Sequence, residues 1–454
     1  MAKKYLIETF GCQMNVHDSE RMAGLLEQAG YERAATDVDA DVILINTCSV
    51  REHAEEKLYT RLGELRVREE ETGRAAAIVV AGCVAQQEGA SLLKKTNGHM
   101  IDVVLGTQQQ KRLPMLIERS AASRAPSIDV SALDDVTFPL GITRRDDPLK
   151  AFVSIVEGCN DHCAFCVVPY TRGHERMRSR DEILAEVHEA VDGGRREVQL
   201  LGQIVNHYQA PEDPSFDFAD LLAAVNDVAG VERIRFASPH PRHTGARLIE
   251  ALKSLPKVCK HIHLPVQSGS TRILTAMRRR YSRDMYLDLV ARLREAVPGI
   301  TISTDMIVGF PGESTADFDD TLSLVERAQY VSMFSFKYSP RPNTLASKRL
   351  PDDVSEADKT SRIMALQALQ RTIQEALHEQ MVGRSFDVMV DSIGRRQEHE
   401  ASGRTGGNVV VNIQRREGDA SPLQMGDTAR ITIERAGPHS AWGRRSEEQA
   451  GVAC

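Results

Sequence analysis

The sequence has no hydrophobic run long enough to cross a membrane. Its longest apolar stretch, around Val80, spans about eight residues, well short of the ~20 that a membrane-spanning helix needs. A secretory leader is also missing from the pattern, because Glu8 and Gln13 interrupt the apolar segment that follows Lys3 and Lys4. We therefore expect a cytoplasmic protein with no membrane partner.

The sequence also lacks an excess of positive charge. It has 57 Lys and Arg against 64 Asp and Glu, a net charge of -7. This balance argues against a protein whose whole surface binds a polyanion, but it is compatible with a local basic surface. Short arginine clusters occur at 278–280, 395–396, 415–416 and 444–445. Each cluster alone is explained by solvated surface, whereas several together are compatible with a nucleic-acid substrate.

The eight cysteines show no disulfide framework. In a reducing compartment, cysteines are better interpreted as metal ligands than as disulfides. Cys259 and Cys454 stand without any partner pattern, and we expect ordinary thiols there. The other six form two sets of three.

The first set is local. Cys159, Cys163 and Cys166 have the spacing C-x3-C-x2-C directly after an apolar stretch at 151–156. Three thiolates on one loop can hold three irons of a 4Fe-4S cluster and leave the fourth iron open to a small molecule. The alternative is a zinc site, although structural zinc takes four protein ligands.

The second set is spread along the chain. Cys12, Cys48 and Cys83 each follow a short β-branched run and precede a helical stretch. Such a repeat indicates parallel strands, whose carboxyl ends share one edge of the sheet. We expect the three thiols to converge there and to hold a second cluster. The alternative is three unrelated buried thiols, because cysteine is often buried.

The fold class is α/β. The first section, 1–118, alternates strands over 5–10, 42–46, 77–81 and 102–106 with helices over 19–28, 51–70 and near Leu92. This pattern predicts a doubly wound domain, followed by a loop-rich connection over 120–150.

The middle section, 145–377, contains six strand-like runs, at 152–156, 197–201, 233–237, 261–266, 300–308 and 331–338. Each precedes a helical pattern, which predicts a partial (β/α)6 barrel with its active site at the carboxyl ends of the strands. A helix over 356–379 leads to the last section, 378–442. There, Phe386, Val388 and Val390 alternate with polar residues, which predicts a small antiparallel β-barrel.

Several ordered motifs carry a resemblance to a known family. They are TFGCQMN at 9–15, NTC at 46–48, AGC at 81–83, VPYTRG at 168–173, PVQSGS at 265–270, DMIVGFPGE at 305–313 and FKYSPRP at 336–342. With the cysteine triad, they resemble the methylthiotransferase family of radical S-adenosylmethionine (SAM) enzymes over nearly the full length. The terminal barrel resembles a TRAM domain, an RNA-binding module.

The resemblance assigns roles by position. It implies that Cys159, Cys163 and Cys166 bind a 4Fe-4S cluster that cleaves SAM to a 5'-deoxyadenosyl radical. It implies that Cys12, Cys48 and Cys83 hold an auxiliary 4Fe-4S cluster that carries the sulfur to be inserted, so that all six count as catalytic. The SAM contacts that it suggests are Phe165, Gly202, Gln203, Asn206, Gln267, Ser268, Val308 and Gly309. The alternative is that Phe165 is simply a core residue.

The implied reaction adds a methylthio group to C2 of N(6)-dimethylallyladenosine next to the anticodon of tRNA. The alternatives within the family are an aspartate of a ribosomal protein and threonylcarbamoyl-adenosine in tRNA. An alternative of another class is a redox-sensing RNA-binding protein that does not cleave SAM. The expected partners are tRNA, SAM and an electron donor such as flavodoxin or ferredoxin, with the enzyme a monomer.

Three positions depart from the family pattern. Ile204 stands where asparagine is usual, Ser179 where proline is common and Asn343 where glycine is usual. None of the three is a cluster cysteine.

Overall fold

The computed structural model describes residues 2–49, 52–96, 101–132, 139–394, 400–414 and 422–446. It forms two compact units, one of residues 1–193, 199–216 and 341–344 and the other of residues 194–198, 217–340 and 345–454. Within the described ranges, no helix is long and apolar enough to span a membrane. The division into three domains stays a prediction.

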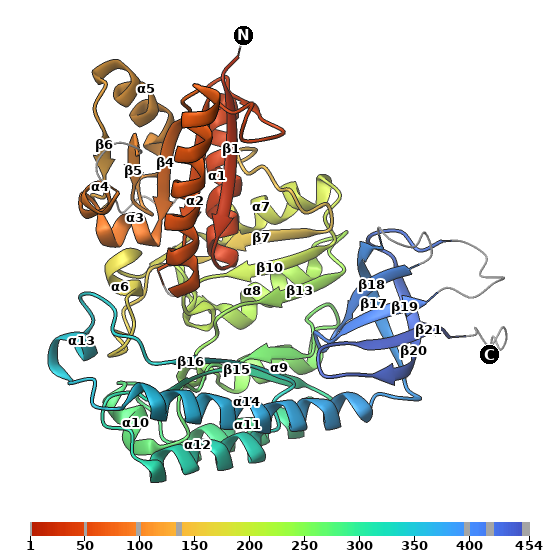
Figure 1. Cartoon of the computed structure of the whole chain (residues 1–454). Coiled ribbons are helices and arrows are strands. Elements are labelled where there is room, and N and C mark those ends of the chain that lie inside the picture. Colours follow the sequence, from red (N-terminus) through yellow and green to blue (C-terminus); the bar gives the residue numbers. More distant parts are fainter. Residues whose placement is uncertain are drawn as a thin grey trace. The chain divides into compact units, whose positions relative to one another are not determined.

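The first unit contains a six-stranded sheet with the order β2-β1-β3-β4-β5-β6; β1, β4, β5 and β6 are labelled in Figure 1. Every neighbouring pair is parallel. The strands are β1 (Lys4–Phe10), β2 (Glu32–Arg33), β3 (Val42–Thr47), β4 (Ala77–Gly82), β5 (Val103–Leu105) and β6 (Ser127–Asp129).

Helices cover both faces of this sheet. They are α1 (Gln13–Gln28), α2 (Glu52–Thr72), α3 (Cys83–Glu88), α4 (Ser91–Lys95) and α5 (Leu113–Ser123), with the 3-10 turn η1 (Gln110–Arg112). Ile43 and Ile45 of β3 pack with Leu58 and Leu62 of α2, whereas Leu44 packs on the opposite face with α1 and α5. The alternation arises because successive strand side chains point to opposite faces. The doubly wound prediction is confirmed.

Two details of this unit differ from the prediction. α1 begins at Gln13 rather than at residue 19, because Cys12 is in extended conformation and Asn15 closes the first turn. The stretch expected to be loop-rich contributes β6, whose three residues are too few to show periodicity.

All six strands of the expected partial barrel are present. They are β7 (Lys150–Ser154), β10 (Glu197–Leu201), β13 (Arg233–Phe236), β14 (His261–His263), β15 (Thr301–Val308) and β16 (Ser332–Lys337). In the second unit, β14, β15 and β16 form a parallel sheet in that order.

The helices between these strands are α7 (Arg180–Asp192), α8 (Phe218–Asp227), α9 (Ala246–Ser254), α10 (Thr271–Ala276), α11 (Arg283–Ala296) and α12 (Thr315–Ala328). Shorter elements are β8 (Val156–Glu157), α6 (Val168–Thr171), β9 (Arg176–Met177), η2 (Val205–His207), β11 (Gln209–Ala210), β12 (Asp213–Asp217), η3 (Pro241–His243) and α13 (Leu345–Arg349). The long helix α14 (Glu356–Glu379) has the bounds that the sequence predicts.

The C-terminal strands close into a barrel of order β17-β18-β19-β21-β20. They are β17 (Ser385–Ile393), β18 (Glu400–Thr405), β19 (Val410–Gln414), β20 (Thr428–Ala436) and β21 (Ala441–Arg445). The barrel is not wholly antiparallel, because β21 inserts between β19 and β20 and runs parallel to β19. Its core contains Val388, Val390, Val411, Ile431 and Ile433.

Candidate functional site

Cys12, Cys48 and Cys83 lie at one edge of the six-stranded sheet. Thr47, the last residue of β3, is in register with Phe10 of β1 and with Gly82 of β4. The backbone N–H of Cys48 donates to the carbonyl of Phe10 at 2.9 Å. Each cysteine thus follows the carboxyl end of one of three adjacent parallel strands, and the structure brings the three together.

Two buried asparagines connect the cysteine-bearing turns. The side-chain oxygen of Asn15 accepts from the backbone N–H of Cys12 at 3.4 Å and lies 3.3 Å from its sulfur. Its amide nitrogen donates to the side-chain oxygen of Asn46 at 3.1 Å, and Asn46 donates back to the carbonyl of Asn15 at 2.8 Å. A Cβ on Gly82 would lie 2.3 Å from the same oxygen of Asn46. The pair therefore touches all three turns.

The thiols share a charged environment. A hydrogen bond with Cys48 lowers the pKa of Cys12, and the positive charge of Arg172 lowers it further against the effect of burial. Burial raises the pKa of Cys83, which Arg172 partly offsets. Soft thiolate sulfur is the ligand that iron–sulfur clusters take, so this set of three donors fits such a cluster.

The loop set also belongs to the first unit. Cys159 is buried, whereas Cys163 and Cys166 are partly exposed. The backbone N–H of Cys166 donates to the carbonyl of Cys163 at 3.0 Å, so the last two cysteines close a tight turn. Burial raises the pKa of Cys159 to about 11, and the neighbouring Cys163 adds to the rise. Binding a metal cation would remove this penalty on the thiolate.

Glycines allow the loop to fold closely. Gly158, directly before the triad, has φ +78°, and a Cβ there would lie 1.9 Å from the carbonyl oxygen of His174. The N–H of Cys159 donates to the carbonyl of Gly173 at 3.1 Å. The loop therefore returns on itself and fixes the position of residues 172–174 beside the triad.

Four of the predicted SAM contacts lie in the first unit. Phe165 is partly buried within the cluster loop, and Asn206 is 9% exposed. A Cβ on Gly202 would lie 3.0 Å from Val156, so the backbone there approaches the strand end before the loop. The buried side-chain oxygen of Gln203 has no hydrogen-bond partner among the described residues. It is available to a ligand.

The other four lie in the second unit. Gln267 and Ser268 are buried, and Gln267 has φ +79° while its backbone pairs with Asp305 and Ile307 of β15. Val308 is buried at the end of β15. Gly309 has φ +71°, and a Cβ there would lie 2.3 Å from the side chain of Lys359. That these eight residues bind SAM stays a prediction.

The sequence did not single out an aromatic face on the β14-β15-β16 sheet. Phe334 and Phe336 of β16 are 54% and 37% exposed, although both belong to a strand. Ser335 and Lys337 point to the other face, where they bond Gln367 and Thr360 of α14. Asp305 is in register with Phe334.

A histidine lies on the same face. The ring of His263 lies 6.3 Å from that of Phe334, and its Nε2 lies 3.4 Å from Oδ1 of Asp305. Exposed aromatic rings beside hydrogen-bonding groups suit a planar, partly polar ligand. In the sequence, the alternation Phe-Ser-Phe at 334–336 could have indicated this aromatic face, because alternate strand residues share one side of a sheet.

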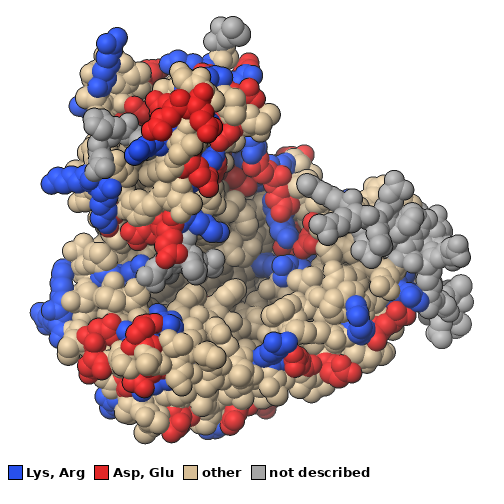
Figure 2. All heavy atoms as spheres, viewed as in Figure 1, with Lys and Arg blue, Asp and Glu red and all other residues tan. Residues whose placement is uncertain are grey.

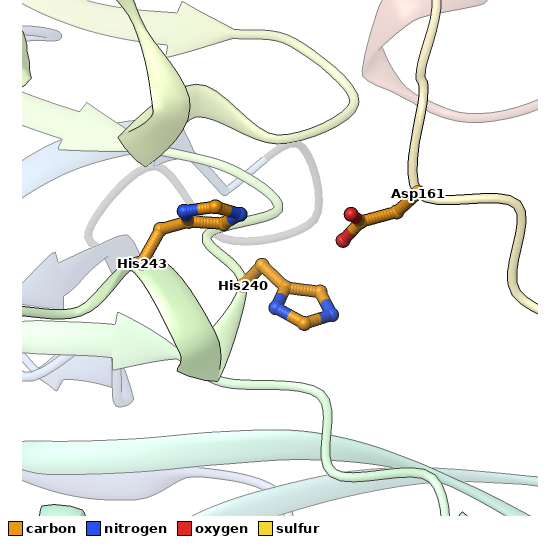
Figure 3. Close-up of side chains that lie close together, drawn as sticks. All are labelled: Asp161, His240 and His243. Carbon is orange, nitrogen blue, oxygen red and sulfur yellow. The ribbon is translucent and has the colours of Figure 1, made fainter. Parts of the chain in front are cut away.

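Two further histidines belong to η3 and its cap: His240 precedes the turn as its N-cap, and His243 is its last residue (Figure 3). The ring centroids of His240 and His243 are 5.8 Å apart. Burial lowers the pKa of His240 to about 2, with Arg279 contributing, so this imidazole is neutral at physiological pH. Its Nδ1 accepts from the N–H of Arg242 at 3.2 Å, and His240 therefore caps the turn. Asp161, also drawn there, belongs to the other unit.

Two of the three unusual residues have a local explanation. Ser179 caps α7 by accepting from the N–H of Glu182. Asn343 has φ +68°, a region that asparagine tolerates better than most residues, so it replaces glycine without a change of backbone. Ile204 is buried at the start of η2, and nothing in the structure explains its replacement of asparagine.

The arginine clusters differ in their surroundings. Arg279 is 6% exposed and donates to the carbonyl of Pro265 at 2.7 Å, so part of the 278–280 cluster is structural rather than solvated. Residues 395–396 and 415–416 lie outside the described residues. On the face drawn in Figure 2, Lys and Arg side chains are interspersed with Asp and Glu.

Comparison with known proteins covers almost the whole chain. Residues 4–106 match the uncharacterized protein family UPF0004, residues 153–325 the radical SAM superfamily and residues 379–444 the TRAM domain. Among solved structures, the radical SAM methyltransferase TsrM from Kitasatospora setae aligns with TM-score 0.54 and 14% identity over 76% of this chain and 74% of that one, which supports the fold.

Curated relatives are much closer in sequence. The tRNA-2-methylthio-N(6)-dimethylallyladenosine synthase of Solibacter usitatus is 42% identical over 443 residues, 97% of each chain. The protein of the same name from Pseudomonas syringae pv. syringae is 44% identical over 449 residues, 98% of this chain and 99% of that one. At this identity and coverage, the chain belongs to the tRNA-2-methylthio-N(6)-dimethylallyladenosine synthase family of radical SAM enzymes.

Proposed function

We propose that this chain is a radical SAM methylthiotransferase that adds a methylthio group to C2 of N(6)-dimethylallyladenosine in tRNA, next to the anticodon. The observation that carries the proposal is the presence of two separate sets of three cysteines within one compact unit. An enzyme that only cleaves SAM needs one such set. The second set supplies what a sulfur-inserting enzyme needs in addition.

We assign Cys159, Cys163 and Cys166 to the cluster that binds SAM, and Cys12, Cys48 and Cys83 to the auxiliary cluster. When bound, the two clusters and SAM supply a carbon-centred radical and the sulfur to be inserted, which acid–base chemistry cannot provide at C2 of adenine. The protein holds the thiols, orients the ligands and excludes water from them.

The aromatic face supports an RNA base as the substrate. Phe334 and Phe336 offer ring surface to a purine, and a dimethylallyl group is apolar. An aspartate side chain has no ring to stack. Threonylcarbamoyl-adenosine has the same purine, but its substituent carries a carboxylate, which gains less from exposed phenyl rings than an apolar dimethylallyl group does. The face therefore favours the prenylated adenosine over both alternatives within the family.

The test is a comparison of modified nucleosides and ribosomal proteins from cells with and without the gene. Mass spectrometry should show that the methylthio group disappears from the prenylated adenosine of tRNA alone. Loss from a ribosomal protein or from threonylcarbamoyl-adenosine would contradict the proposal. A purified protein that binds RNA but forms no 5'-deoxyadenosine from SAM under a strong reductant would contradict the enzymatic class.

The remaining partners follow from this chemistry. Reductive cleavage of SAM requires a one-electron donor, for which a flavodoxin or ferredoxin is suitable. We place the reaction in the cytoplasm, where tRNA is found, and propose that the enzyme acts as a monomer. tRNA affinity should fall steeply with salt, because phosphate contacts release counterions.

A further inference from the structure

Arg172 is a buried cation between the helices that begin at two of the auxiliary cysteines. It lies at the end of α6, which packs against α3, and α3 begins at Cys83. Its Nη2 donates to Oδ2 of Asp18 at 2.6 Å, and Asp18 lies on α1, which begins after Cys12. Arg172 and Asp18 are 5% and 2% exposed. The ion pair joins segments 154 residues apart.

The guanidinium also acts on the thiols. Its positive charge lowers the pKa of both Cys83 and Cys12. Hydrogen bonds to the backbone fix the position of Arg172. The side-chain nitrogen of Gln108 donates to the carbonyl of Arg172 at 2.9 Å. The backbone N–H of Cys159 donates to the carbonyl of the next residue, Gly173. A fixed cation thus stands at the predicted auxiliary centre and on the segment that contacts the other cysteine set.

We propose that Arg172, held by Asp18, is a positioning residue that sets the reduction potential of the auxiliary cluster. The inference rests on the proposed function, because it requires that cluster. A cation near a cluster favours the reduced form, because that form carries the extra negative charge. Asp18 limits this effect by neutralising part of the charge.

The test isolates the auxiliary cluster. In a background in which Cys159, Cys163 and Cys166 are all replaced by alanine, the reconstituted protein should retain about four irons, and its one-electron midpoint potential and electron paramagnetic resonance spectrum can be measured alone. Arg172→Gln should shift the midpoint to more negative values and alter the spectrum. Arg172→Lys, which keeps the charge, should restore much of the midpoint. Asp18→Asn, which leaves the guanidinium less neutralised, should shift it in the positive direction.

Arg145→Gln is the matched control, because Arg145 is equally buried and paired with carboxylates, Glu186 and Glu189. It should leave the midpoint near that of the background. Unchanged midpoints in both Arg172→Gln and Asp18→Asn would overturn the proposal while leaving the enzyme's function intact. If Arg172→Gln binds no iron, the Asp18→Asn shift decides alone. No iron in the background itself would overturn the auxiliary centre, and the proposal with it.

Discussion

The guanidinium of Arg21 on α1 lies 3.0 Å from a carboxylate oxygen of Glu157, two residues before Cys159. Arg21 is 1% exposed, and the side chain of Glu157 is 12% exposed. The helix that begins at the first auxiliary cysteine is therefore bound to the strand end that leads into the loop triad. The Arg21–Glu157 pair therefore connects the helix after Cys12 with the strand before Cys159.

Replacing Glu157 by Gln should destabilise the first unit by about 1.5–3 kcal/mol, because it removes a charge-assisted hydrogen bond to the buried Arg21. Urea unfolding followed by circular dichroism measures the loss. Glu189→Gln is the control, since its side chain is 30% exposed and Arg145 keeps Glu186, so we expect a loss below about 1 kcal/mol. Equal stability of the two variants would contradict the structural role of the Arg21–Glu157 pair.

The auxiliary cysteines should be separable from the loop triad. The wild type should bind about eight irons after anaerobic reconstitution, and the triple replacement of Cys12, Cys48 and Cys83 by alanine should bind about four. This variant should still form 5'-deoxyadenosine from SAM but no methylthiolated product, because the other ligand set is intact. Cys259→Ala, also at a buried cysteine, should keep the full iron content. Product formation by the triple variant would remove the auxiliary site from the mechanism.

The aromatic face should contribute to substrate binding. Phe334→Ala should weaken binding of a prenylated anticodon stem-loop by about 1–3 kcal/mol, the usual contribution of one stacked aromatic ring. Gln367→Ala is the control, because Gln367 bonds Ser335 on the opposite face of the strand. Separate titration of SAM shows which ligand the ring contacts. Normal affinity for the stem-loop would exclude Phe334 from the substrate site.

Stability should depend on pH through His261. Burial lowers its pKa to about 3, and Arg235 and His263 add to the effect. His261 binds a proton near pH 6.5 in the unfolded chain but stays neutral in the folded protein at that pH. Its neutral form therefore contributes fully to the free energy of unfolding above pH 6.5, and this contribution falls as the pH drops toward 3. The slope reaches about 1.4 kcal/mol per pH unit for one group. Thermal unfolding of wild type and His261→Gln at pH 7.5 and 5.5 should show a smaller acid loss in the variant. An identical loss in both would contradict this assignment.

Regular patterns made most of the fold predictable. The three strand-then-cysteine repeats located the shared sheet edge, and the six strand runs located the partial barrel. β18 and β21 were missed because Gly403 and Gly443 interrupt the alternation of side chains. Both glycines lie against neighbouring backbone where a Cβ would come within 2.1 and 2.3 Å. A strand that needs glycine for such close backbone contact lacks the alternation of apolar and polar side chains that identifies a strand in sequence.

The cysteine sets were predictable because each thiol either belongs to a short motif or follows a recognisable strand. Thiol spacing suggests a metal from sequence alone. The pairing of Arg172 with Asp18 depends on how α6 packs near α1. The sequence around either residue does not indicate which residue it pairs with. Likewise, the FSF alternation places two phenyl rings on one face of β16, but only the packing of α14 shows which face is covered.

The asparagine pair has a consequence for maturation. Asn15 and Asn46 bond each other and reach Gly82, so the polypeptide itself spaces the three sheet-edge sulfurs. At the proposed auxiliary site, these hydrogen bonds between protein groups would hold the three thiols in position before iron binds. Hydrogen exchange in this neighbourhood should be similar in the iron-free and iron-loaded forms, and cluster insertion should be limited by delivery of iron and sulfide.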